Sequence, residues 1–139
     1  MIKLFVSDVD GVLTDGSMYY SELGDEIKRF NTYDGMAFEI LRKKGIKTAI
    51  ITSEVTRIVT NRSKKMKIDF VHQGIVGQGK LDVVKSICEV NNISFDSVSY
   101  IGDDINCFEL LANVKYAACP SNAVIKIKEI SNILIKSAG

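Results

Sequence analysis

The chain has 139 residues and a mass of 15.4 kDa, which suits one compact domain and leaves no room for a second. Its hydrophobic fraction of 46% and charged fraction of 25% are typical of a globular protein and exclude disordered, fibrous and membrane-embedded classes. Because 18 Lys and Arg balance 17 Asp and Glu, no global field favours nucleic acid or an anionic membrane as a partner. We expect a single domain over residues 1–139 without either partner.

The first residues and the cysteines bear on the compartment. Asp8 interrupts the N-terminal apolar run before it is long enough for a signal peptide or a membrane span. The three cysteines, Cys88, Cys107 and Cys119, are widely spaced and contain no CxxC pair, which is typical of buried thiols in a reducing compartment. We expect a cytoplasmic protein.

The chain opens with a predicted strand and a predicted hairpin. β-Branched and aromatic residues fill residues 2–7, and this run ends abruptly at Asp8. Two further β-favouring stretches, residues 17–21 and 27–32, flank a turn that contains Gly and Asp. A β-hairpin is therefore expected within residues 15–32.

The following segment predicts a helix that begins near Asp34 and ends before Gly45, with Met36, Ile40 and Leu41 on its inner face. The later elements alternate between strands and helices. Strands are predicted at 46–52, 68–71, 97–101 and 116–119, and helices at 54–67, 80–91, 108–112 and 123–135. The helix at 80–91 is amphipathic, and its inward residues are Val83, Val84, Ile87 and Val90. This alternation predicts an α/β fold, a Rossmann-like three-layer sandwich with a mainly parallel sheet. In such folds ligands bind beyond the carboxyl ends of the strands.

Acidic residues follow the predicted strands at that edge. Asp8 and Asp10 come after the first strand, and Asp103 and Asp104 come after the strand at 97–101. Clustered carboxylates repel one another unless a cation lies among them, and hard oxygen ligands suit Mg²⁺. The sequence therefore predicts a magnesium site.

Two further polar residues indicate phosphate chemistry at this edge. Thr52 ends the second parallel strand, and Lys80 opens the helix after the third. A carboxylate that approaches a phosphate dianion meets repulsion on the order of 4 kcal/mol per charge pair at ~4 Å in an effective dielectric of ~20. Mg²⁺ and the Lys80 ammonium would offset that repulsion, so Asp8 could attack phosphorus while Asp10 protonates the leaving alkoxide and later activates water.

The order of these motifs, DxDGxxT(D), then Thr52, Lys80 and GDD, resembles the haloacid dehalogenase superfamily over nearly the whole chain. The resemblance implies that Asp8 is the nucleophile and Asp10 the acid/base. It also implies that Thr52 donates a hydrogen bond to the phosphate and that Lys80 binds it. Asp8, the main-chain carbonyl of Asp10, and Asp103 would hold Mg²⁺ in this family. Asp104 would orient Lys80 or a metal-bound water.

The chain has no large insertion that could form a cap domain, and in this it resembles the capless branch of the superfamily. The hairpin at 15–32 is then the only cap-like element. DVDGVLTDG, FNTYDG and GDDIN resemble the phosphatases of 3-deoxy-octulosonate 8-phosphate and of nonulosonate (sialic-acid-type) 9-phosphate, enzymes of lipopolysaccharide and sialic-acid biosynthesis. The resemblance implies a sugar-phosphate substrate and a homotetramer formed through the hairpin. A neighbouring subunit would then cover the open site.

Two residues bear on the choice of sugar. Glu54 and Lys65 resemble the nonulosonate pattern, so we expect nonulosonate 9-phosphate first and octulosonate 8-phosphate second. Eleven residues apart on one helix, Glu54 and Lys65 would lie about 16 Å apart along its axis, so both touch one sugar only across a subunit interface. The other interpretations are a helix-start carboxylate and a solvated charge.

Two alternative functions use similar residues. A signalling receiver domain also combines aspartates, Mg²⁺, a Thr or Ser and a Lys, although the acidic motif after the fourth parallel strand does not fit its order. A catalytically weak scaffold paralogue would keep the tetramer without turnover, and Cys107 replaces an Asp that the family commonly carries there.

Overall fold

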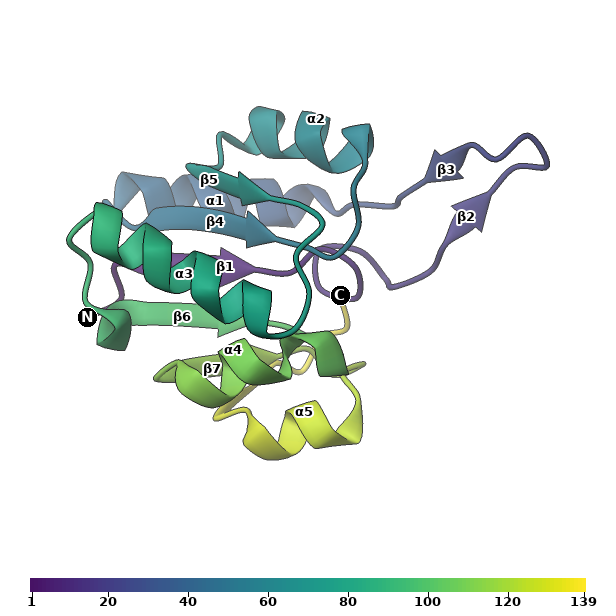
Figure 1. Cartoon of the computed structure of the whole chain (residues 1–139). Coiled ribbons are helices and arrows are strands. Elements are labelled where there is room, and N and C mark those ends of the chain that lie inside the picture. The colour runs from purple at the N-terminus through teal and green to yellow at the C-terminus, as the bar shows by residue number, and fades with distance from the viewer.

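A computed structural model, which describes all 139 residues, contains one six-stranded parallel sheet (Figure 1). The strand order is β5-β4-β1-β6-β7-β8. The strands are β1 (Leu4–Ser7), β4 (Lys47–Ile51), β5 (Phe70–His72), β6 (Val98–Ile101), β7 (Tyr116–Cys119) and β8 (Ile133–Leu134). All five neighbouring pairs are parallel, which confirms the predicted α/β class.

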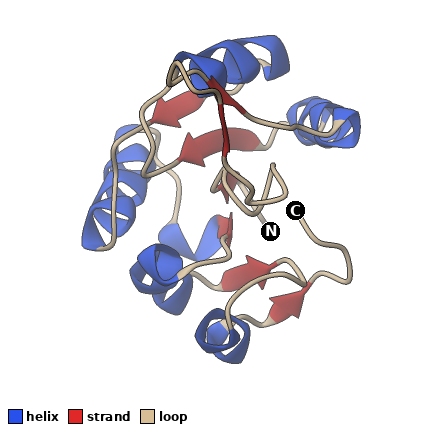
Figure 2. Cartoon of the chain, turned by 90° about the vertical axis from the view of Figure 1, so that its right-hand side faces the viewer, coloured by secondary structure: helices blue, strands red, loops and turns tan.

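Helices cover both faces of this sheet, as Figure 2 shows in a view along the strands. They are α1 (Thr32–Lys43), α2 (Arg57–Met66), α3 (Gln78–Val90), α4 (Phe108–Asn113) and α5 (Ile125–Ile130), with short 3-10 turns η1 (Phe95–Ser97) and η2 (Ile105–Cys107). The core is divided accordingly. An 18-residue cluster joins the sheet to α3, α4 and α5, and a six-residue cluster joins it to α1 and α2.

Two boundaries differ from the prediction because side-chain caps decide where helices begin. Asn31 accepts a hydrogen bond from the Tyr33 amide, so α1 begins at Thr32 and the predicted second hairpin strand at 27–32 is too long. Thr56 caps α2 in the same way, which leaves Glu54 in the preceding loop instead of in the predicted helix.

Some residues predicted to face the core are exposed. On α1 the buried residue is Phe38, whereas Met36 and Ile40 are 56% and 47% exposed. Val90, in the last turn of α3, is 79% exposed, although Val84 and Ile87 are buried as predicted. Where aliphatic residues occupy several faces of a helix, helical spacing alone does not select the buried one.

The predicted C-terminal helix at 123–135 is also wrong in length. The helix α5 ends at Ile130, and the chain then forms β8, whose Ile133 pairs with Ala118 of β7. The Asn132 amide and side chain bond to carbonyls of Ala117 and Lys115, which fixes this return to the sheet. A two-residue edge strand has too little alternation to be distinguished from a helix end by sequence pattern.

The hairpin is an excursion from the carboxyl end of the sheet (Figure 1). Its strands are only β2 (Tyr19–Tyr20) and β3 (Glu26–Ile27), shorter than predicted, and they pair antiparallel. Ser21 and Asp25 close the turn through backbone and side-chain bonds. None of the helices combines the length and the hydrophobicity needed to cross a membrane.

Candidate active site

Three of the predicted site residues follow the adjacent strands β4, β1 and β6. Ser7 at the end of β1 is in register with Ile50 of β4 and Ile101 of β6. Asp8 and Thr52 directly follow β1 and β4, and Asp103 lies two residues beyond the end of β6. The parallel register therefore places all three at the carboxyl edge of the sheet.

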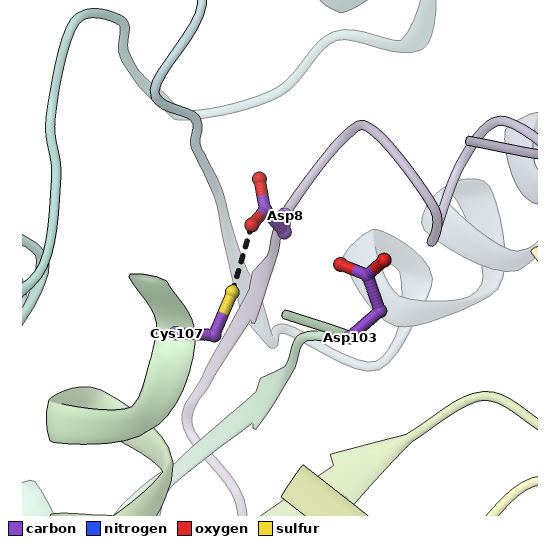
Figure 3. Close-up of side chains that lie close together, drawn as sticks. All are labelled: Asp8, Asp103 and Cys107. Atoms are coloured by element: carbon purple, nitrogen blue, oxygen red, sulfur yellow. Dashed lines mark hydrogen bonds between the residues drawn. The ribbon is translucent and has the colours of Figure 1, made fainter. Parts of the chain in front are cut away.

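Asp8 is almost fully buried, and both of its carboxylate oxygens accept hydrogen bonds. Oδ1 accepts from the Val9 amide at 2.8 Å. Oδ2 accepts from the Lys80 ammonium at 2.6 Å and from the Cys107 thiol at 2.9 Å, the contact drawn in Figure 3. These bonds hold the carboxylate in one orientation at the strand end.

Lys80 is fully buried, and its ammonium contacts the Asn106 side-chain oxygen at 3.0 Å as well as Asp8. Burial lowers the pKa of Lys80, but the electrostatic interactions and hydrogen bonds with Asp8 and Cys107 together outweigh burial and leave that pKa above its ordinary value. The side chain therefore stays cationic. The sequence placed Lys80 here but missed Asn106.

Asp103 lies beside Asp8 with no cationic partner. One oxygen of Asp103, one of Asp8 and the Cys107 sulfur all lie within 4.8 Å of one another (Figure 3). Burial, with the nearby charges of Asp8 and Asp104, raises the pKa of Asp103 to about 7. A buried carboxylate beside another is the arrangement that a divalent cation stabilises, so these oxygens fit the predicted Mg²⁺ site.

Gly11 makes room for Asp103. Its φ of +76° is in the left-handed region, and a Cβ at this position would overlap the Asp103 carboxylate. The Asn122 side chain donates to the Gly11 carbonyl at 2.9 Å and fixes this turn after β1. A larger residue at 11 would displace Asp103 from Asp8.

Cys107, predicted as a buried thiol and as a departure from the family pattern, is buried and is also a site residue. Its sulfur lies 3.5 Å from the Lys80 ammonium as well as 2.9 Å from Asp8. Burial and the charge of Asp8 raise the pKa of the thiol to about 12, so it remains protonated and donates to Asp8. The signal in the sequence was its position three residues after Asp104.

Asp10 pairs with Lys28, a residue that no sequence pattern indicated. The Lys28 ammonium donates to Asp10 Oδ1 at 2.6 Å, and Glu26 Oε1 lies 2.9 Å from the same nitrogen. Burial lowers the pKa of Lys28, but the carboxylates of Asp10 and Glu26 outweigh burial and raise it. Lys28 lies just after the hairpin strand β3, where no periodic pattern predicts burial.

Thr52 and Asp104 lie at the same edge of the sheet, and the side chain of each accepts one local hydrogen bond. Thr52 is buried, and its hydroxyl accepts from the Glu54 amide at 3.4 Å. Asp104 accepts from the Ile105 amide at 2.7 Å and so caps η2. It makes no bond to Lys80, whose orientation depends on Asn106 and Cys107 instead.

The two residues expected to select the sugar lie apart in this chain. Glu54 is exposed in the loop that follows Thr52, whereas Lys65 is exposed in the last turn of α2. Lys65 lines a surface cavity of about 390 Å³ with the cations Arg42, Arg62 and Lys67. One chain does not bring Glu54 and Lys65 together.

Residues 15–139 match the family described as haloacid dehalogenase-like hydrolase. A curated relative, the 3-deoxy-D-manno-octulosonate 8-phosphate phosphatase of Escherichia coli, is 32% identical over 122 residues, which cover 88% of this chain. The chain spans 64% of the length of that relative.

Two solved structures are similar over 99% of this chain. A probable YrbI family phosphatase from Pseudomonas syringae has a TM-score of 0.94 and 37% identity and is covered over 77% of its length. The 3-deoxy-D-manno-octulosonate 8-phosphate phosphatase of Moraxella catarrhalis, in complex with magnesium, phosphate and KDO, has a TM-score of 0.93 and 30% identity, with 78% of its length covered.

Proposed function

The chain belongs to the haloacid dehalogenase-like hydrolases, and from that premise we propose that it hydrolyses the phosphate monoester of a 2-keto-3-deoxy sugar acid. The observation that carries this proposal is the contact of 2.6 Å between the Lys80 ammonium and Asp8 Oδ2, with the Asp103 carboxylate alongside. A buried carboxylate between an ammonium and a cation site is suited to attack phosphorus.

In the first step an oxygen of Asp8 attacks phosphorus while the bond to the ester oxygen breaks. Lys80, already charged and buried, stabilises the charge on the phosphoryl oxygens without reorganisation. The Thr52 hydroxyl, at the end of the neighbouring strand, donates to the same oxygens. The product of this step is an aspartyl phosphate on Asp8 and the alcohol of the sugar acid.

Asp10 handles the proton in both steps. It gives a proton to the leaving alkoxide, and it then takes one from the water that attacks the aspartyl phosphate. Asp10 Oδ2 is buried and has no hydrogen-bond partner, whereas Oδ1 is held by Lys28. The oxygen free to exchange a proton is therefore Oδ2.

Asp8, Asp103 and the main-chain carbonyl of Asp10 would hold Mg²⁺. The ion, when bound, neutralises the two carboxylates and the charge of the phosphate. Cys107 lies on the Lys80 side of Asp8 and is a protonated thiol, so the hard cation is left to the oxygen ligands.

The substrate that we propose first is 3-deoxy-D-manno-octulosonate 8-phosphate, because the Escherichia coli and Moraxella catarrhalis relatives are phosphatases of this compound. Nonulosonate 9-phosphate is the second candidate, supported by Glu54 in the loop next to Thr52. Glu54→Ala should change the ratio of kcat/KM for the two sugars if Glu54 selects between them. An unchanged ratio would remove the support for the nonulosonate.

We further propose that the chain forms a homotetramer through the hairpin. The hairpin carries large apolar side chains that are more than a third exposed, namely Met18, Tyr19, Tyr20, Leu23 and Ile27. Such a group on a two-stranded excursion is typical of a protein–protein contact. A neighbouring subunit would also bring its own α2 surface toward the site, as joint action of Glu54 and Lys65 requires.

The decisive experiment measures phosphate release from a panel of sugar phosphates with Mg²⁺. Wild type should turn over, and Asp8→Asn and Asp10→Asn should each lower kcat by ~10³-fold or more. Asp96→Asn is the matched control, because Asp96 is an exposed carboxylate before β6, at the opposite edge of the sheet. A stable phosphoprotein without release would indicate a receiver domain, and no turnover of any substrate would indicate a scaffold.

A further inference from the structure

Lys28, just after hairpin strand β3, makes an ion pair with Asp10 in the acidic loop after β1. In contrast to Arg29, which pairs with Asp15 from an exposed position, the Lys28 side chain is buried. Its side chain is 1% exposed, and its ammonium lies 2.6 Å from Asp10 Oδ1 and 2.9 Å from Glu26 Oε1. An ammonium removed from water this completely is costly unless it is paired, and both partners are carboxylates. Glu26, Lys28 and Asp10 thus form a chain of charges from β3 to the loop after β1.

The two oxygens of Asp10 have different surroundings because of this contact. Oδ1 accepts a short, charge-assisted hydrogen bond from Lys28, which fixes the rotation of the carboxyl group. Oδ2 is buried without any partner. Buried polar atoms are nearly always hydrogen-bonded, so an unpaired oxygen beside a nucleophile is suited to a group that arrives with the substrate.

We propose that Lys28 is a positioning residue for proton transfer by Asp10: it holds Oδ1 and so directs Oδ2 toward the leaving oxygen of the substrate. This inference rests on the proposed role of Asp10 as acid and base. Lys28 keeps its own proton throughout. The proton that reaches the alkoxide leaves Asp10 Oδ2 as the bond between phosphorus and the ester oxygen breaks.

The competing explanation is that Lys28 only anchors the hairpin. The two explanations differ in how replacing Lys28 changes the cleavage rates of esters with different leaving groups. An alkoxide must be protonated as it leaves, whereas 4-nitrophenolate leaves without a proton. A residue that acts through the general acid therefore affects the alkyl ester alone, and a structural anchor affects both esters equally.

The test measures single-turnover cleavage of the ester bond, with Mg²⁺ and excess enzyme, for 3-deoxy-D-manno-octulosonate 8-phosphate and 4-nitrophenyl phosphate. Single turnover isolates the first step from hydrolysis of the aspartyl phosphate. Lys28→Met should slow cleavage of the sugar phosphate by ~10²-fold and cleavage of the aryl phosphate by less than ~3-fold. Lys28→Arg, which keeps a cation near Oδ1, should recover part of the loss.

Glu26→Gln provides a second variant in case Lys28→Met does not fold, because it keeps Lys28 but removes the charge of one of its two carboxylate partners. It should give the same selectivity for the alkyl ester with a smaller loss. Equal losses on both esters, or no loss on either, would overturn the positioning role while leaving the phosphatase proposal intact. A wild type that cleaves neither ester would overturn both.

Discussion

Helix α3 and the β2–β3 hairpin each place a buried lysine beside one aspartate of the pair that follows β1. The two lysines come from regions that differ in how well they are packed. Lys80 lies on a 13-residue helix whose Leu81, Val84 and Ile87 belong to the main core. Lys28 follows a two-residue strand on a hairpin whose apolar side chains are largely exposed. The packing of its helix and one ion pair fix the first lysine, whereas two ion pairs fix the second. Changes in the two regions should therefore have different consequences.

Among changes to the two lysine-bearing regions, the largest effect is expected when Lys80 is replaced by Met. Asp8 and Asp103 would then be buried with no cation, and breaking a buried pair from one side costs ~3–5 kcal/mol. Phosphate release should fall by ~10²- to 10³-fold, because a preorganised charge on the phosphoryl oxygens is lost. Urea unfolding without metal and a phosphate-release assay measure the two losses.

The double variant Lys80→Met/Asp8→Asn separates charge from packing. It removes the uncompensated carboxylate, so it should recover much of the stability while staying inactive. A double variant as unstable as Lys80→Met would show that the lysine stem, and not its charge, matters to the core. In that case the charge of Lys80 would contribute less to stability than we infer, and the packing of its side chain would contribute more.

Association should depend on the hairpin and not on α3. Leu23, at the hairpin tip, is 92% exposed, and Leu23→Asp should weaken self-association by ~30-fold or more if the hairpin is the interface. The free energy of unfolding of the dissociated chain should change by less than ~0.5 kcal/mol. Sedimentation velocity over a concentration series measures the association.

Val90→Asp is the matched control for the hairpin substitution, since Val90 is an equally apolar, 79% exposed residue at the end of α3. It should leave association unchanged. Similar losses in both variants would mean that any added charge prevents association, and a wild type that stays monomeric at micromolar concentration would exclude the tetramer.

The contrast between the two lysines also shows what the sequence could predict. Alternating strands and helices predicted the parallel sheet, and parallel strands must end at one edge, so Asp8, Thr52 and Asp103 could be placed there without coordinates. Lys80 followed from the start of an amphipathic helix. These predictions depend on periodic patterns and on the geometry of a regular sheet.

The contacts of Lys28, Asn106 and Cys107 could not be predicted in the same way. Lys28 lies in a segment without periodicity, and its burial depends on an ion pair with Asp10, 18 residues earlier in the chain. Asn106 and Cys107 belong to a single 3-10 turn whose capping by Asp104 directs both toward Lys80. Sequence patterns report which face of an element is apolar and not which polar groups meet across it.

A pH-dependent effect is expected because neither lysine contacts Asp103. Its pKa of about 7 lies above the ordinary 3.8, so without metal the folded chain binds more protons than the unfolded chain between these values. The contribution of Asp103 to the stability of the metal-free protein should then fall as the pH rises from about 4 to about 7 and should level off above that range. Mg²⁺ should raise the melting temperature more at about pH 7.5 than at about pH 5, because protons compete with the metal for Asp103.

Thermal unfolding in EDTA and in Mg²⁺ at these two pH values measures this effect, with Asp103→Asn as the reference that cannot titrate. In EDTA, the melting temperature of wild type relative to that of Asp103→Asn should be lower at about pH 7.5 than at about pH 5. A difference that is independent of pH would mean that Lys80, on α3, already compensates Asp103 as well as Asp8.

The smallest effect is expected at Cys107, which adds a neutral donor to the carboxylate that Lys80 already neutralises. Because its pKa is raised to about 12, the thiol donates to Asp8 at 2.9 Å across the whole working pH range. A thiol is a weak donor, so its bond to the Asp8 carboxylate contributes ~1 kcal/mol; Cys107→Ala should lower kcat by ~5-fold, and Cys107→Ser, which keeps a donor, by less than ~3-fold. Steady-state kinetics with Mg²⁺ measure both. If Cys107→Ala instead lowered kcat nearly as much as Lys80→Met, the thiol and the ammonium would act on Asp8 as one unit. The orientation of the Asp8 carboxylate would then depend on η2 as much as on α3.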